Sequence, residues 1–78
     1  MDARRFKLAF GAVLRDHRTR QGYTQESFAA KTRLHRNYIS GVERGEYNLT
    51  IESLLRIAEG LGVDLPDLVR NAWQSATR

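Results

Sequence analysis

The side chains best suited to chemistry lie on one short stretch of the chain, residues 36–44. In a helix over residues 36–44, several polar side chains would share the outward face. A guanidinium, an amide and a hydroxyl are the groups that bond base edges in a DNA major groove. The same arginines could instead be solvated helix charges, so the surrounding chain must decide. The outward positions are Arg36, Asn37, Ser40, Gly41 and Arg44, with Tyr38 at the edge.

The charge is divided unevenly along the chain. The first 44 residues carry ten Lys or Arg and four Asp or Glu, a net charge of +6. Residues 45–78 carry three Lys or Arg and five Asp or Glu, a net charge of −2. Eleven of the thirteen basic residues are arginine, whose planar fork suits phosphate and guanine. A basic half beside a mildly acidic half predicts one face for a polyanion and another for a different contact.

Length and composition argue against an enzyme. The chain has 78 residues, which predicts one domain spanning residues 1–78 without room for a large cofactor pocket. It has no Ser-His-acid set, carboxylate pair or metal cluster, and Gly60-Leu61-Gly62 fits a helix end rather than a phosphate loop. We predict no enzymatic activity, no cofactor and no metal site. With no cysteine and an apolar run of only seven residues, Leu8 to Leu14, we expect a cytoplasmic protein without a membrane segment.

Helical periodicity and end signals predict an all-α domain of five helices. Gly22 stops the first helix in a left-handed cap, and the hydroxyls of Thr24 and Thr50 cap the second and fourth helices. The later helices are predicted over residues 25–32, 36–44, Thr50 to Gly62, and about 65–76.

Residues 25–44 are predicted to form a helix, a three-residue turn and a second helix. Ala29 is small enough to let the two helices cross closely, and Leu34 would fill the turn. The fourth helix is predicted to bury Ile51, Leu54, Leu55, Ala58 and Leu61.

Two motifs in this region, Gln25-Glu26-Ser27-Phe28-Ala29 and Tyr38-Ile39-Ser40-Gly41-Val42-Glu43-Arg44-Gly45, carry a family resemblance. They resemble the XRE-type, lambda-repressor/Cro-like helix-turn-helix regulators, over roughly residues 10–69. With Asn48-Leu49-Thr50-Ile51, the sequence is most similar to the controller proteins of restriction–modification operons. The resemblance implies a five-helix, lambda-repressor-like DNA-binding domain.

The resemblance also implies roles for individual residues. Gln25 would bond a phosphate and brace the third helix, whereas Arg18 and Glu43 would form an internal salt bridge. Tyr38 has packing on the second helix as an alternative role. The implied DNA contacts are Gln25, Arg36, Asn37, Tyr38, Ser40, Arg44, Tyr47 and Asn48.

Three positions depart from the family pattern. Arg33 stands where glycine is usual in the turn, and a left-handed arginine costs about 1 kcal/mol, so we expect a slightly different turn. His17 replaces a core leucine and is interpreted as a partly buried, hydrogen-bonded imidazole. His35 replaces the usual Ser or Asp cap of the third helix. Either the start of that helix is weaker, or the His35 ring contacts a phosphate.

The last helix carries an apolar stripe that predicts a second copy of the chain. Part of the stripe must close the domain's own core, but an exposed tryptophan favours a partner. In the family that the chain resembles, the last helix often pairs with its twin. Trp73 folding back onto its own chain is the alternative. The expected homodimer contacts are Leu68, Ala72 and Trp73.

These features predict a transcriptional regulator that binds an inverted-repeat operator, with its two recognition helices in major grooves about 34 Å apart. As a controller protein it would regulate its own restriction–modification operon. Glu26 matches a position that touches RNA polymerase in some relatives, but Ala30 leaves that patch incomplete. Activation and repression therefore both stay open. The alternatives are an antitoxin-type or phage-type repressor, and a helix-turn-helix-shaped adaptor that binds protein.

Overall fold

The computed structural model describes all 78 residues and contains five α-helices and no β-strand. This confirms the predicted fold class, although the third helix ends one residue earlier than predicted. No helix is both long and apolar enough to span a membrane. The helices are α1 (Ala3–Arg20), α2 (Gln25–Thr32), α3 (Arg36–Glu43), α4 (Ile51–Leu61) and α5 (Leu65–Ala76).

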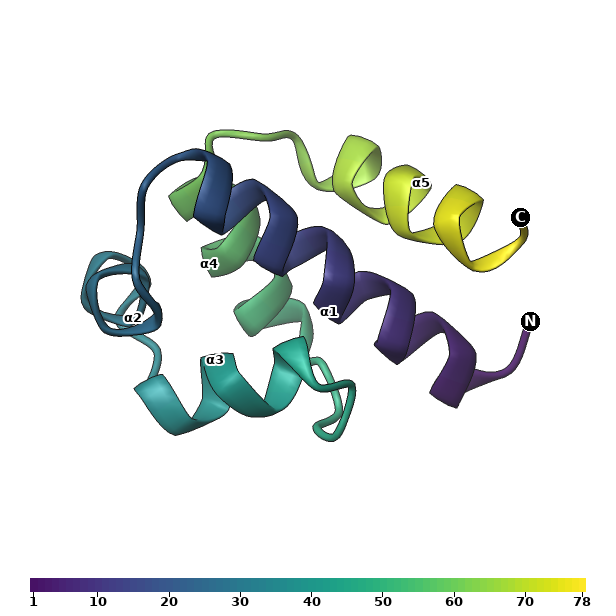
Figure 1. The fold of residues 1–78 in the computed structure, drawn as a ribbon, viewed down its shortest axis with the longest axis horizontal. Helices are drawn as coiled ribbons and strands as arrows, with labels where there is room; N and C mark the ends of the chain where they lie inside the picture. Colours follow the sequence, from purple (N-terminus) through teal and green to yellow (C-terminus); the bar gives the residue numbers. More distant parts are fainter.

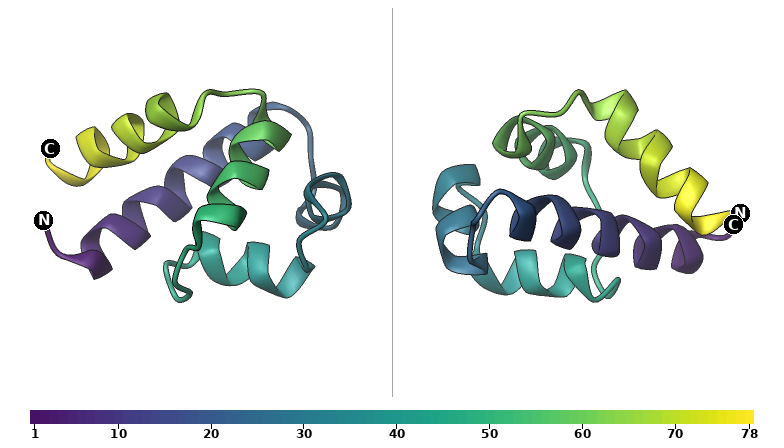
Figure 2. Two further views of the ribbon diagram at one scale, coloured as in Figure 1. Left: turned by 180° about the vertical axis from the view of Figure 1, so that it is seen from behind. Right: turned by 45° about the horizontal axis from the view of Figure 1, so that its top comes forward.

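Helix α1 is the central element of the fold. It runs between α5 on one side and α3 on the other, and α2 is seen end-on beside α3 (Figure 1). The two helices of the helix-turn-helix unit therefore cross steeply. Helix α4 closes the far side, and the two chain termini lie close together at the end shared by α1 and α5 (Figure 2).

The helix ends follow the predicted signals. The Thr24 hydroxyl accepts from the Ser27 amide at 3.0 Å, and the Thr50 hydroxyl accepts from the Ser53 amide at 3.0 Å. Each cap satisfies an amide that has no partner within its own helix. Gly22 follows α1 with φ of 81°, as the predicted left-handed stop requires. Local chemistry therefore sets the helix boundaries.

One apolar core joins all five helices. Ala29 is only 5% exposed, in agreement with its predicted place at the helix crossing. His17 is half-buried as expected, but it hydrogen-bonds through its backbone, whose carbonyl accepts from the Gln21 amide, and not through its imidazole, so the predicted hydrogen bond of its imidazole was wrong. The apolar side chains with no exposed surface are Phe10, Leu14, Phe28, Ile39, Ile57, Leu68 and Ala72.

The buried face of α4 differs from the prediction. Ile51 and Leu55 are 72% and 53% exposed, whereas Ile57 and Leu61 are buried. Apolar residues cover more of the circumference of α4 than its neighbours can pack against. The predicted burial of Ile51 and Leu55 was therefore wrong, and their exposure leaves an apolar patch that the monomer does not cover.

Helix α5 also differs from the prediction. Leu68 and Ala72 are fully buried within the single chain, so they have no surface left for a dimer contact. Trp73 is half-exposed, and its ring centroid lies 6.4 Å from that of Phe6 on α1. The stripe on α5 thus mainly closes the domain's own core. Of the three predicted dimer residues, only Trp73 is accessible.

Candidate nucleic-acid interface

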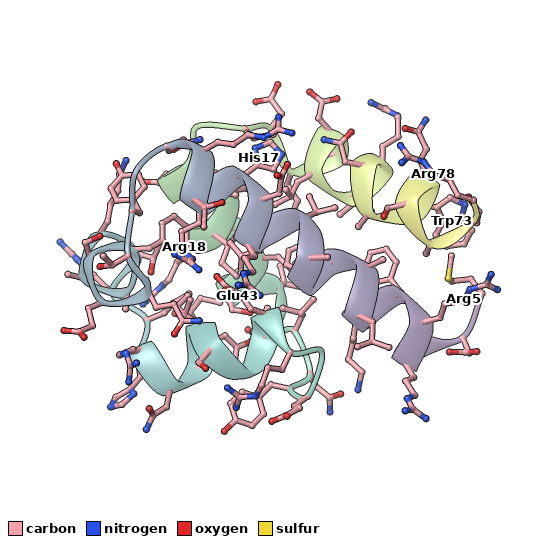
Figure 3. All side chains as sticks on the ribbon, in the orientation of Figure 1. Arg5, His17, Arg18, Glu43, Trp73 and Arg78 are labelled. Atoms are coloured by element: carbon pink, nitrogen blue, oxygen red, sulfur yellow. The ribbon has the colours of Figure 1, made fainter.

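A buried ion pair fixes α3 on α1. Arg18 Nε donates to Glu43 Oε2 at 2.6 Å, and Nη2 donates to Oε1 at 3.0 Å. The two side chains are only 8% and 4% exposed, and Figure 3 shows them pointing toward one another between the helices. Arg18 also donates to the Tyr23 carbonyl at 2.8 Å. The salt bridge implied by the resemblance is present, and it holds α3 in a fixed orientation.

Gln25 joins this network from the start of α2. Its Nε2 donates to Glu43 Oε1 at 3.1 Å, so Gln25 braces α3 as the resemblance implied. The same contact ties α2 and α3 together through one carboxylate. The helix-turn-helix unit is therefore held by polar contacts as well as by the apolar core.

Gly11 allows α1 and α3 to approach closely. A Cβ atom at this position would lie 2.4 Å from the Val42 carbonyl oxygen and 2.6 Å from the Glu43 carbonyl oxygen. Any side chain would push α3 away from α1. This close approach was not predicted, although a glycine in the middle of a helical pattern is a signal for it.

The turn between α2 and α3 keeps the left-handed geometry despite its arginine. Arg33 has φ of 60°, so the expected change of turn is wrong. Arg56 Nη1 donates to the Arg33 carbonyl at 3.1 Å, so the turn is also tied to α4. His35 caps α3, since its Nδ1 accepts from the Asn37 amide at 3.0 Å. An imidazole thus takes the place of the usual Ser or Asp cap.

The outward face of α3 presents most of the predicted polar side chains together. Arg36, Asn37 and Arg44 are exposed and Ser40 is half-buried. Arg36 Nε lies 3.8 Å from the Glu26 carboxylate on α2. Four of the six residues placed on this face by the sequence therefore lie on one accessible surface.

The other two residues, Gly41 and Tyr38, do not lie freely on this face. Gly41 is buried, and a Cβ there would lie 2.3 Å from the Tyr47 ring. Tyr38 stacks on Tyr47 with ring centroids 5.8 Å apart. Its hydroxyl lies 3.0 Å from the Asn48 carbonyl oxygen and 2.9 Å from the Ser53 hydroxyl. Tyr38 thus holds the loop between α3 and α4.

That loop presents its own polar groups beside α3. Tyr47 is 42% exposed and Asn48 is exposed. Lys7 of α1 donates from Nζ to Asn48 Oδ1 at 3.2 Å. This contact places a positive charge beside the loop. Lys7 was not among the predicted residues, because a contact across 41 residues leaves no local pattern in the sequence.

Arg44 ends the outward face and is paired with a carboxylate. Its Nε and Nη2 donate to Glu46 Oε2 and Oε1 at 3.0 and 3.1 Å, and its Nη1 donates to the Ser40 hydroxyl. The hydrogen bond from Arg44 holds the pKa of the Glu46 carboxyl below its usual range. The same bond raises the pKa of the Arg44 guanidinium. Both groups are therefore charged at neutral pH.

Comparisons with known proteins agree on one family. The helix-turn-helix family profile matches residues 14–68. Control protein C.BamHI of Bacillus amyloliquefaciens is 38% identical over 64 residues, or 81% of this chain and 79% of that protein. Control protein C.MunI of a Mycoplasma species is 40% identical over 63 residues, which cover 80% of this chain and 85% of that protein.

A solved structure of a relative extends this similarity to the fold. It is the restriction–modification controller protein C.Esp1396I, solved as a tetramer in complex with its natural 35 base-pair operator. It superposes with a TM-score of 0.83 at 36% sequence identity, covering 94% of this chain and 96% of that one.

Proposed function

Since the chain belongs to the helix-turn-helix family of XRE-type transcriptional regulators, of the restriction–modification controller kind, we propose that it binds an inverted-repeat operator as a homodimer and controls its own restriction–modification operon. The family is one of DNA-binding regulators and not of enzymes. The observation that carries the proposal is how α3 is held against α1 and α2. Its polar outward face is exposed, while the Arg18–Glu43 pair fixes its inner side.

The polar groups around α3 divide into two kinds of DNA contact. Those on the helix itself suit base edges in the major groove, because α3 is the second helix of the helix-turn-helix unit, the one that enters the groove in proteins with this motif. Those on the flanking elements suit phosphates, which fix the position of the protein without reading sequence. We assign Tyr38 to support of the loop. The proposed base readers are Arg36, Asn37, Ser40 and Arg44, and the proposed phosphate contacts are Gln25, Tyr47, Asn48 and Lys7.

The dimer surface that we propose is the exposed apolar patch on α4. Ile51 and Leu55 are one helical turn apart and 72% and 53% exposed, and adjacent large apolar side chains of this kind mark protein contacts. Ile51 follows Asn48 after only two residues. A two-fold axis through the patch would therefore bring two DNA-facing loops together. Trp73, at the far end of α1 and α5 (Figure 3), is the competing surface.

The test is selection of duplex DNA from a random library by the purified protein at near-physiological salt, followed by sequencing. We expect enrichment of an inverted repeat with half-site centres about one helical turn apart. The enriched site should also occur upstream of the protein's own gene. If no sequence is enriched, the proposed base-reading roles on α3 are wrong, and a protein-binding adaptor becomes the better interpretation. If a site is enriched but lies elsewhere in the genome, the protein reads DNA sequence but does not control its own operon.

Single substitutions on α3 test which arginines read bases. Arg36→Ala and Arg44→Ala should each weaken binding to the selected operator about 5- to 150-fold, as loss of a bidentate guanine contact does. Binding to a shuffled duplex should fall much less. Arg70→Ala removes the same charge from an exposed position on α5 and serves as the control. Equal losses on both duplexes would instead assign the arginine to phosphate.

A further inference from the structure

The pairing of Arg44 with Glu46 occupies only part of the guanidinium. An arginine has five N–H donors, one on Nε and two on each Nη. Glu46 accepts one from Nε and one from Nη2, while Ser40 accepts one from Nη1. Two donors remain, one on each Nη nitrogen. A pair of donors on adjacent nitrogens is what the O6 and N7 atoms of guanine accept.

The carboxylate also changes what else Arg44 can bind. A free exposed guanidinium attracts any phosphate, because that attraction depends on charge and not on sequence. With Glu46 bound at about 3 Å on both oxygens, the pair carries no net charge. A phosphate near Arg44 would also meet the negative Glu46. A guanine edge is uncharged and does not suffer this repulsion.

We propose that Glu46 is a positioning and specificity-determining residue for DNA reading by Arg44. It holds one edge of the guanidinium so that the two remaining donors face a guanine, and it cancels the charge that would attract phosphates of any sequence. This inference rests on the proposed function, since it needs an operator that Arg44 reads. The lowered pKa of the Glu46 carboxyl agrees with a pair that stays charged at neutral pH.

The test compares Glu46→Gln with Glu59→Gln. Both remove one negative charge, but Glu59 is exposed on α4 and takes part in none of the six salt bridges, so it controls for overall charge. The probes are the operator selected by the wild-type protein and a shuffled duplex of the same length, each titrated by fluorescence anisotropy. A third variant, Arg44→Ala combined with Glu46→Gln, asks whether Glu46 acts through Arg44.

We expect Glu46→Gln to bind the shuffled duplex about 1.4- to fivefold more tightly, the range that corresponds to freeing an exposed ion-paired charge. Operator binding should stay equal or weaken, so the ratio of the two affinities falls. In the Arg44→Ala background, the Glu46→Gln change should have no further effect.

Three results would overturn the inference. One is a Glu46→Gln variant that matches Glu59→Gln on both duplexes. Another is an equal gain on both duplexes, which would mean general electrostatics only. The third is an effect that persists without Arg44. A wild-type protein with no operator preference would instead overturn the proposed function itself, so the two failures are distinguishable.

Discussion

Replacing Glu43 with alanine should lower the free energy of unfolding by about 3–5 kcal/mol, the cost of leaving a buried charge without its partner. The Arg18 side chain is 8% exposed and loses both of its bonds to the carboxylate. Domains of this length have about 4–12 kcal/mol of stability in total, so the substitution should remove a large part of the free energy of unfolding. Urea denaturation followed by circular dichroism measures the change directly.

Two further variants separate the buried pair from ordinary surface charge. Glu52→Ala breaks an exposed pair with Arg56 and should cost no more than about 1 kcal/mol. The double variant Arg18→Met, Glu43→Leu replaces both charges with apolar groups and should be more stable than Glu43→Ala alone. A Glu43→Ala loss no greater than that of Glu52→Ala would contradict the role of the pair in fixing α3.

The sequence predicted the helices because their ends depend on neighbouring residues. Thr24 and Thr50 cap amides three residues away, and Gly22 supplies a left-handed stop. Such contacts can be recognised from the local sequence, since the partners are fixed by helix geometry. The positions of Arg36, Asn37 and Arg44 on one exposed face followed from the same helical period.

The support of the site could not be predicted in this way, because its partners are distant in sequence or were assigned to the wrong face. Lys7 meets Asn48 across 41 residues, and Tyr38, predicted at the edge of the outward face, bonds the loop and α4. The exposure of Leu55 depends on how far neighbouring helices wrap around α4. Apolar periodicity gives the direction of a buried face but not its width.

Replacing Leu55 with aspartate should turn a dimer into a monomer and weaken operator binding at least about 100-fold, because two linked half-sites gain that much from simultaneous engagement. Leu55 is 53% exposed, so the charge should not disturb the core. Light scattering coupled to gel filtration gives the mass, which should fall to the 9.0 kDa of one chain. Ile51→Asp should act in the same direction.

Trp73→Asp is the matched change on the competing surface, since Trp73 is 50% exposed. It should leave a folded variant dimeric, with folding checked by circular dichroism because Trp73 lies close to Phe6. A monomer from Trp73→Asp and a dimer from Leu55→Asp would assign the contact to α5, as the apolar stripe first indicated.

A duplex carrying one half-site separates dimerisation from DNA reading. One chain is sufficient to occupy it, so Leu55→Asp should bind a half-site as wild type does. The loss should appear only on the full inverted repeat, where the second α3 adds its contacts. A loss on the half-site as well would mean that the substitution disturbs α3 through the loop that Tyr38 holds. In that case the patch on α4 supports the DNA-binding face and is not the dimer contact.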